Sequence, residues 1–192
     1  PLFTLPQPQY WNVRLGDHHI KKKEDTEKTY NVSKVHYNAW YSKYDNDIAI
    51  MRLSEPVTVN ENIRPICMPS KEDTFEGLDC VATGWGKVDF DKKGSSVLRK
   101  VNVKVFDNSV CHNAYHDKFD ISIHRWHLCA GTLEGGKGTC HGDSGGPFQC
   151  KRGDKWYLAG LTSFGSGCAK RGFPDVYTRI TYFLDWIALT KL

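Results

Sequence analysis

A serine flanked by glycines marks the stretch of this chain best suited to nucleophilic chemistry. Residues 138–147 read G-T-C-H-G-D-S-G-G-P, which places Asp143 directly before Ser144 and Cys140 four residues back. Glycines on both sides permit backbone conformations that a side chain would forbid, and they let another molecule approach closely. A substrate can reach a hydroxyl set in this way, with peptide N–H groups turned toward the same spot. The alternative interpretation is a tight turn after a disulfide cysteine.

Asp47 is the second residue whose setting indicates chemistry. It lies in N-D-I-A, residues 46–49, and runs directly into the apolar segment 48–51. A carboxylate taken out of water at the start of a strand needs hydrogen-bond partners. We therefore expect Asp47 to be a buried, hydrogen-bonded side chain rather than an exposed turn aspartate.

Short strands separated by turn residues must position these groups. Segments with strand character cover residues 11–15, 48–51, 81–83, 101–105 and 156–161. Many short strands joined by Gly-, Asp- and Asn-rich turns are typical of an all-β sandwich or barrel.

The tail and one connector divide the chain further. Apolar residues over 180–188 recur at helical spacing, which predicts a C-terminal helix. Pro65 and Pro69 mark a connector between a front part, about residues 1–65, and a rear part, about residues 75–192. Fewer strand candidates precede the connector than follow it, so the front part has too few strands to form a closed barrel. We expect further sequence to precede it.

Bulk composition excludes several classes of protein. The chain has 192 residues, 40% hydrophobic and 25% charged, with a formal net charge of +4. This length fits one ordinary domain or two small halves that share an interface. No apolar run is long enough to span a membrane, and the charge is too mild to indicate nucleic acid. We predict neither a nucleic-acid nor a membrane partner.

Cysteine usage indicates an oxidising, secreted setting. No pair shows the C-x-x-C spacing of a zinc site, so the cysteines are better explained as disulfides. Their number is odd, which leaves at least one free or paired outside the chain. The triplet at Asn31 is a legal N-glycosylation sequon. The seven cysteines are Cys67, Cys80, Cys111, Cys129, Cys140, Cys150 and Cys168.

Five landmarks together resemble the chymotrypsin-like (trypsin-like) serine proteases, in the order of that family and over nearly the whole chain. They are C-H-G-D-S-G-G-P at 140–147, D-N-D-I-A-I-M-R-L at 45–53, G-W-G at 84–86, L-C-A-G at 128–131 and S-F-G-S-G-C…P-D-V-Y-T-R at 163–179. The resemblance implies an all-β fold of two six-stranded antiparallel β-barrels with a C-terminal helix. It also implies an active site between the barrels, and the first barrel is incomplete in this chain.

The resemblance assigns Ser144 as the nucleophile, the N–H groups of Gly142 and Ser144 as the oxyanion hole, and Asp47 as the triad acid. In this family the base precedes the acid, and only three histidines precede Asp47. None lies in a string like T-A-A-H-C, so we expect the base upstream of Pro1 and expect this chain alone to be inactive. The three are His18, His19 and His36.

Further roles follow from the same resemblance. Asp143 corresponds to the acid that pairs with a new N-terminal ammonium when a zymogen is cleaved. The implied disulfides are Cys80–Cys150, Cys111–Cys129 and Cys140–Cys168. Cys67 is left over, and in relatives this cysteine often joins the catalytic domain to an upstream pro-segment or light chain.

The implied substrate pocket departs from that of trypsin. Gly138 takes the place of the aspartate six residues before the serine, and an acid occurs instead at Asp175. This exchange resembles the crustacean collagenolytic proteases (brachyurins) and predicts broad specificity, with basic and large apolar residues accepted. The alternative is that Asp175 points into a local hydrogen-bond network. The predicted pocket residues are Gly138, Thr139, His141, Ser163, Phe164, Gly165 and Asp175.

The loop from Asp17 to Glu27 resembles the calcium loop of trypsin-like proteases. Carboxylates and backbone carbonyls are the ligands that calcium prefers. Adjacent lysines oppose cation binding, so a salt-bridged loop without metal is the alternative, and we expect no required cofactor. The candidate calcium residues are Asp17, His19, Lys22, Glu24 and Glu27.

Together these features predict a secreted, glycosylated serine endopeptidase that cleaves proteins or peptides through an acyl-enzyme. Its expected partners are protein or peptide substrates, protease inhibitors and a pro-segment or light chain. Two alternatives stay open. One is a catalytically inactive homologue that acts as a binding or cofactor protein, and the other is a clotting, immune or venom protease that recognises one protein through exosites.

Overall fold

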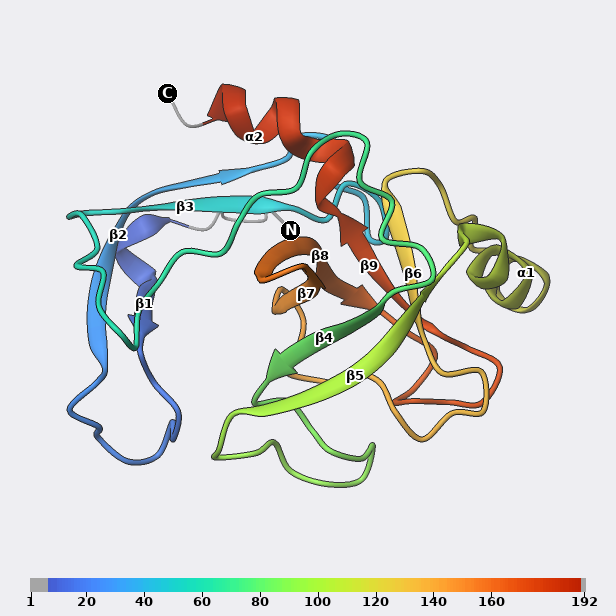
Figure 1. The fold of residues 1–192 in the computed structure, drawn as a ribbon, viewed down its shortest axis with the longest axis horizontal. Helices are drawn as coiled ribbons and strands as arrows, with labels where there is room; N and C mark the ends of the chain where they lie inside the picture. Colours follow the sequence, from blue (N-terminus) through green and yellow to red (C-terminus); the bar gives the residue numbers. More distant parts are fainter. Residues whose placement is uncertain (1–6, 191–192) are drawn as a thin grey trace.

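A closed antiparallel β-barrel forms the rear part of the chain, in a computed structural model that describes residues 7–190. The strands follow one another around the barrel in the order β4-β5-β6-β9-β8-β7 (Figure 1). Alternate side chains point inward along each strand, as at Cys80 and Ala82 of β4 and at Val103 and Val105 of β5, and these fill the core. The strands are β4 (Asp79–Gly84), β5 (Arg99–Phe106), β6 (His127–Gly131), β7 (Pro147–Arg152), β8 (Lys155–Phe164) and β9 (Asp175–Arg179).

The front part is a three-stranded antiparallel sheet in the order β1-β2-β3. It comprises β1 (Asn12–Leu15), β2 (Lys28–Tyr37) and β3 (Ala49–Leu53), preceded by a 3-10 turn, Pro8–Tyr10. The all-β prediction, with one complete barrel, a second partial sheet and a C-terminal helix, is confirmed.

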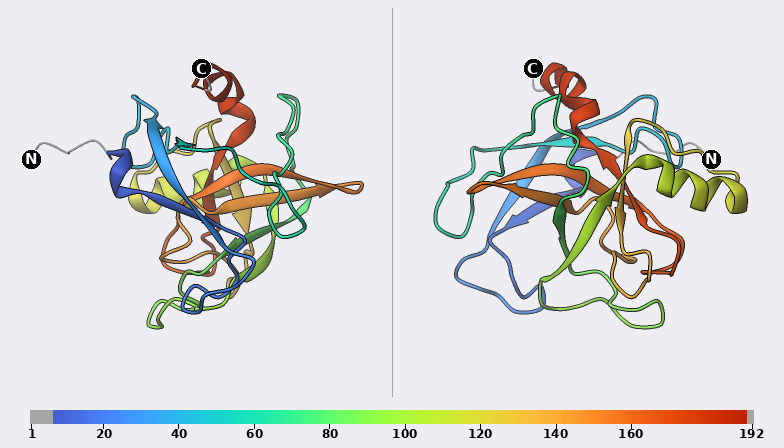
Figure 2. Two further views of the ribbon diagram at one scale, coloured as in Figure 1. Left: turned by 90° about the vertical axis from the view of Figure 1, so that its left-hand side faces the viewer. Right: turned by 45° about the vertical axis from the view of Figure 1, so that its right-hand side comes forward.

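The C-terminal segment lies across the junction between sheet and barrel (Figures 1 and 2). Ile180, Phe183 and Ile187 form one apolar cluster with Ile48, which directly precedes β3. Burial of this cluster ties the tail of the chain to the segment that follows Asp47. The tail therefore helps to hold the two parts in register.

The helices differ from the sequence analysis in two places. The tail is not one helix, because a 3-10 turn, Ile180–Phe183, precedes the short helix α2 (Leu184–Thr190). The helix α1 (Asn108–Phe119) was not predicted. Its periodicity is weak because only Cys111 and Tyr115 are buried. The signal that marks it is the cap at Asp107, whose side chain accepts a hydrogen bond from the Ser109 N–H. No helix within residues 7–190 is long and apolar enough to cross a membrane.

Candidate active site

Asp47 lies at the end of the loop between β2 and β3 and is held by side chains of the barrel. Ser163 donates its hydroxyl to Asp47 Oδ2 at 2.8 Å, and Thr178 donates its hydroxyl to the Asp47 carbonyl at 2.7 Å. The Ile48 N–H bonds to the Asn46 carbonyl at 2.9 Å, which turns the chain sharply at Asp47. Asp47 is half-buried and hydrogen-bonded, so its carboxylate keeps one side open to solvent.

Ser144 is exposed on a tight turn that glycines make possible. Gly142 and Gly145 have φ angles of 96° and 77°, in the region that side chains disfavour. The Gly145 N–H donates to the Thr162 carbonyl at 2.8 Å, and the Gly146 carbonyl accepts from the Thr162 N–H at 2.9 Å. The turn is thereby fastened to β8, next to Ser163.

The N–H groups that flank this hydroxyl are available to a ligand. Within the part of the chain that the structure describes, neither the Gly142 N–H nor the Ser144 N–H has a protein hydrogen-bond partner. Two unpaired donors beside a hydroxyl can stabilise an oxyanion that forms there.

Ser163 links the serine and the acid. Ser144 and Ser163 line one cavity of about 200 Å³, and Ser163 hydrogen-bonds to Asp47. Both side chains therefore lie near Ser163. With an imidazole between them, a hydroxyl, a carboxylate and free N–H groups in this arrangement can carry out acyl transfer.

No histidine within residues 7–190 hydrogen-bonds to the Asp47 or Ser144 side chain. His18 and His19 lie in the loop after β1, where their N–H groups bond to Glu24, and His36 lies in β2 opposite Ile50. The structure thus places Ser144 and the two free N–H groups on one turn next to Ser163, whose hydroxyl holds Asp47, and no histidine of residues 7–190 bonds to either side chain.

The same cavity contains every predicted pocket residue except Gly138. Asp175 is 4% exposed, and its Oδ2 accepts from the Thr139 N–H at 2.6 Å and the Thr139 hydroxyl at 3.0 Å. Burial raises the pKa of Asp175 to about 6, against the lowering effect of the Thr139 bonds. A hydrogen-bond network therefore holds one carboxylate oxygen of Asp175 at the cavity wall.

Two glycines make room for this carboxylate. A Cβ at Gly138 would come within 2.7 Å of Asp175 Oδ2, and a Cβ at Gly165 would come within 2.8 Å of Asp175 Oδ1. Gly138 thus abuts the Asp175 carboxylate without lining the cavity. The absence of a side chain at Gly165 leaves space beside Oδ1 of Asp175.

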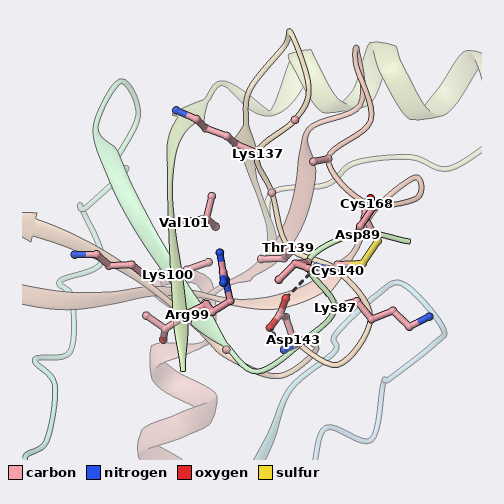
Figure 3. A pocket seen from close by; sticks show the side chains of 18 residues that line it. Lys87, Asp89, Arg99, Lys100, Val101, Lys137, Thr139, Cys140, Asp143 and Cys168 are labelled. Atoms are coloured by element: carbon pink, nitrogen blue, oxygen red, sulfur yellow. Dashed lines mark hydrogen bonds between the residues drawn. A yellow bond between two sulfur atoms is a disulfide. The ribbon is translucent and has the colours of Figure 1, made fainter. Parts of the chain in front are cut away.

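Asp143 points away from this cavity into a second one of about 420 Å³, shown in Figure 3. Its carboxylate accepts from the Gly86 N–H at 2.8 Å and the Cys140 N–H at 3.1 Å. A Cβ at Gly84 or Gly86 would collide with it, which explains the glycines of the G-W-G motif.

Side-chain cations do not neutralise Asp143. No salt bridge to Asp143 forms among residues 7–190, and the ammonium groups of Lys87, Lys100 and Lys137 point away from it in Figure 3. A carboxylate held only by backbone N–H groups retains its attraction for a cation that enters the cavity.

The disulfides that the resemblance implied are present. They join Cys80 to Cys150, Cys111 to Cys129 and Cys140 to Cys168. Cys67 has a free, exposed thiol. Its N–H donates to the Trp156 carbonyl at 3.2 Å and its carbonyl accepts from the Leu158 N–H at 3.0 Å, so this backbone is fixed against β8.

The candidate calcium loop is arranged around an arginine. Arg14 lies 3.1 Å from Asp17 Oδ2 and 3.8 Å from Glu27 Oε2. Glu24 is committed elsewhere, because the His18 and His19 N–H groups both donate to its Oε2 at 2.7 Å and lower its pKa.

We propose that ion pairs rather than calcium hold this loop. Asp17 Oδ1 and Glu27 Oε2 are buried without hydrogen-bond partners, but the Arg14 guanidinium already supplies the positive charge that they would attract. No cluster of three or more His, Cys, Asp or Glu side chains in the described part of the chain is placed to hold a metal.

The loop yields a testable prediction on metal dependence. Millimolar calcium or a chelator should move the melting temperature of the intact protein by less than about 1 °C, because a ligand stabilises only when it binds the folded state. Replacing Arg14 by Gln frees both carboxylates, and Arg14→Gln should gain a calcium-dependent rise of about 3 °C. Differential scanning calorimetry checks both, with Arg125→Gln as the control. A melting temperature of the wild type that falls sharply on chelation would contradict this reading.

Comparison with known proteins adds an independent finding. A sequence model of the family described as Trypsin matches residues 5–187. The chain is 40% identical over 187 residues to the proclotting enzyme of Tachypleus tridentatus, and the aligned region covers 93% of this chain and 49% of that protein. It is 39% identical over 184 residues to trypsin-1 of Astacus astacus, and the aligned region covers 94% of this chain and 75% of that protein. The chain thus spans about half the length of the first relative and three quarters of the second.

Proposed function

Because the chain belongs to the trypsin family of serine proteases, we propose that it carries the nucleophile, acid and oxyanion hole of a secreted serine endopeptidase. One observation supports this most directly. Ser144 lines a cavity together with Ser163, the Ser163 hydroxyl holds the Asp47 carboxylate, and the Gly142 and Ser144 N–H groups on the Ser144 turn have no protein partner within residues 7–190. Its substrates are proteins or peptides, and inhibitors shaped like substrates compete for that cavity.

The reaction follows from these positions. Ser144 Oγ attacks the scissile carbonyl while an imidazole takes its proton, and the carbonyl oxygen becomes an oxyanion bound by the Gly142 and Ser144 N–H groups. Collapse expels the amine, which receives the proton, and leaves an acyl-enzyme that water then hydrolyses. Asp47 Oδ1 accepts no protein hydrogen bond within residues 7–190, so it is available to orient the imidazole.

The imidazole comes from a segment outside the described residues. His18 and His19 lie in the loop after β1, His36 lies in β2, and no histidine of residues 7–190 hydrogen-bonds to the Asp47 or Ser144 side chain. Without a base the Ser144 hydroxyl is a weak nucleophile, and this chain by itself has no appreciable peptidase activity.

Specificity depends on Asp175. Its Oδ1 lies next to Gly165, and both residues line the cavity, where the carboxylate can pair with a Lys or Arg side chain of the substrate. Thr139 already hydrogen-bonds to Oδ2 of Asp175, which lies in the side wall of the cavity. Because part of the carboxylate is bonded in this way, the cavity also accepts large apolar side chains. Residues 163–165 at the end of β8 bind the substrate backbone as an added strand.

Activation and processing use three further features. When the zymogen is cleaved, the new α-ammonium enters the cavity beside Asp143, since that carboxylate has only backbone donors. Cys67 pairs with a pro-segment or light chain, which its exposed thiol permits. Asn31 is exposed on β2 and is accessible for glycosylation, and three disulfides fit an oxidising, extracellular setting.

Covalent labelling tests the assignment. A fluorophosphonate probe should phosphonylate Ser144 Oγ of the activated full-length protein, because the oxyanion hole accepts the phosphoryl oxygen as fluoride leaves. Mass spectrometry should locate the adduct at Ser144, and Ser144→Ala should remain unlabelled. Ser109→Ala, which changes an exposed serine on α1, should be labelled like the wild type.

An inactive homologue predicts a different result. The absence of a histidine at Asp47 within residues 7–190 is the observation that would favour a binding or cofactor protein. In that case the full-length protein, correctly processed, would show neither labelling nor peptide hydrolysis.

A further inference from the structure

His127 is a buried histidine at the start of β6 with both ring nitrogens engaged. Its Nδ1 accepts from the His124 N–H at 3.0 Å, and its Nε2 lies 2.9 Å from the Tyr44 carbonyl oxygen. An amide N–H is a donor and a carbonyl oxygen is an acceptor, so the ring must be neutral with its proton on Nε2. The side chain is 2% exposed, and water cannot replace these partners.

The bond to Tyr44 fastens the loop that carries Asp47. The same loop receives a hydrogen bond at 2.9 Å from Trp126 Nε1 to Asp45 Oδ1. Within the loop, Lys43 and Asn46 have φ angles of 30° and 53°, a conformation that non-glycine residues rarely keep without external support. The barrel supplies that support.

We propose that His127 is a positioning residue for Asp47, and that protonation of its ring in mild acid releases the loop. The inference rests on the proposed function, since it takes Asp47 as the acid of the reaction. A proton added at Nδ1 would face the His124 N–H, so two donors would oppose each other and the bond would be lost. The buried ring would also carry an unsolvated charge.

The surroundings decide the pH at which this happens. Burial lowers the pKa of His127 below its ordinary value, and the nearby His124 and Arg179 act in the same direction. The Asp45 carboxylate, 3.7 Å from Nε2, opposes them. The Tyr44 carbonyl bond also raises the pKa, and Phe164 meets the imidazole edge-on without charge.

The direction of the effect follows. The unfolded chain binds a proton at an ordinary pKa of about 6.5, and the folded chain binds it only at lower pH. The stabilising contribution of neutral His127 is therefore complete above about pH 6.5, and it is lost as the pH falls through the lowered pKa.

Two substitutions distinguish the effect of the hydrogen bond to Tyr44 from the effect of protonating the His127 ring. His127→Gln keeps an N–H donor toward Tyr44 but does not titrate, whereas His127→Leu removes the donor. In the activated full-length enzyme at pH 8, His127→Leu should lower kcat by about 10- to 100-fold with KM within about threefold, because a misplaced acid costs rate rather than binding. His127→Gln should keep kcat within about threefold and lose one ionisation from the acid limb of its kcat–pH profile. His116→Gln, on the exposed surface of α1, is the matched control.

The proposal is overturned if His127→Leu retains wild-type kcat, or if His127→Gln keeps the wild-type acid limb. If His127→Leu does not fold, the pH profile of His127→Gln decides alone.

Nitrogen NMR of the ring in Ser144→Ala provides a readout independent of catalysis. It should find the proton on Nε2 at pH 8 and a second proton on Nδ1 in mild acid, and a proton on Nδ1 at pH 8 would refute the bond to Tyr44. Failure of the fluorophosphonate test defeats the proposed function, and with it the catalytic role of His127, but leaves this measurement of the contact unaffected.

Discussion

Replacing Asp47 by Asn should lower kcat for peptide ester hydrolysis by about 10⁴-fold at neutral pH, as the same change does in a serine–histidine–aspartate triad. Ser163 donates to Oδ2 of Asp47, so the remaining oxygen must accept the imidazole N–H. In Asp47→Asn an amide NH2 group, which is a donor, can replace the carboxylate oxygen that accepts the imidazole N–H. The imidazole is then held in the wrong tautomer. Steady-state kinetics of the activated full-length enzyme measure the loss.

Controls for this prediction address folding and charge. Asp117→Asn makes the same chemical change on the exposed surface of α1 and should leave kcat within about twofold, as surface substitutions usually do. The melting temperature of Asp47→Asn should stay close to that of the wild type. Retention of more than a tenth of the wild-type kcat would remove Asp47 from the catalytic acid role.

Replacing Asp175 by Gly should reduce kcat/KM for substrates with Lys or Arg at the cleavage site by roughly 100-fold, since losing one partner of a buried charge pair costs about 3 kcal/mol. Substrates with Leu or Phe there should stay within about threefold. The double variant Gly138→Asp/Asp175→Gly should regain Lys and Arg cleavage from the opposite wall. Gly138→Asp alone should be impaired, because a side chain at 138 meets the Asp175 carboxylate. Equal losses of kcat/KM for basic and apolar substrates would show that Asp175 maintains the structure of the pocket but does not determine which substrate side chain binds.

The same residue sets a pH dependence. Burial raises the pKa of Asp175 to about 6, so the carboxylate is charged above that pH and increasingly neutral below it. The ratio of kcat/KM for an Arg substrate to that for a Leu substrate should therefore rise from pH 5 to pH 7 and then level off. Taking a ratio cancels the titration of the catalytic base, which both substrates share. Asp175→Asn should give a flat ratio, and a flat ratio in the wild type would contradict the assignment.

Local sequence determined much of this protein, because some residue types admit few explanations. The glycines around Ser144 permit positive φ angles, which Gly142 and Gly145 adopt, and therefore predict the turn that exposes the hydroxyl. Alternating apolar residues predict the strands of the barrel, since side chains alternate across a strand. The exchange of Gly138 and Asp175 was readable from the chain, although only the structure showed that Thr139 binds the carboxylate.

Tertiary structure decided the features that join residues far apart in the chain. Thr178 and Asp47 are 131 positions apart, and His127 and Tyr44 are 83 apart, yet each pair is hydrogen-bonded across the junction of sheet and barrel. No local pattern marks such pairs, because a hydrogen bond depends on which surfaces meet when the chain packs. The calcium loop shows the same limit, since the acids were visible in the sequence but the placement of Arg14 between them was not. Residue types and spacing therefore specified what chemistry is available, and packing specified which groups are neutralised, aligned or left free to perform it.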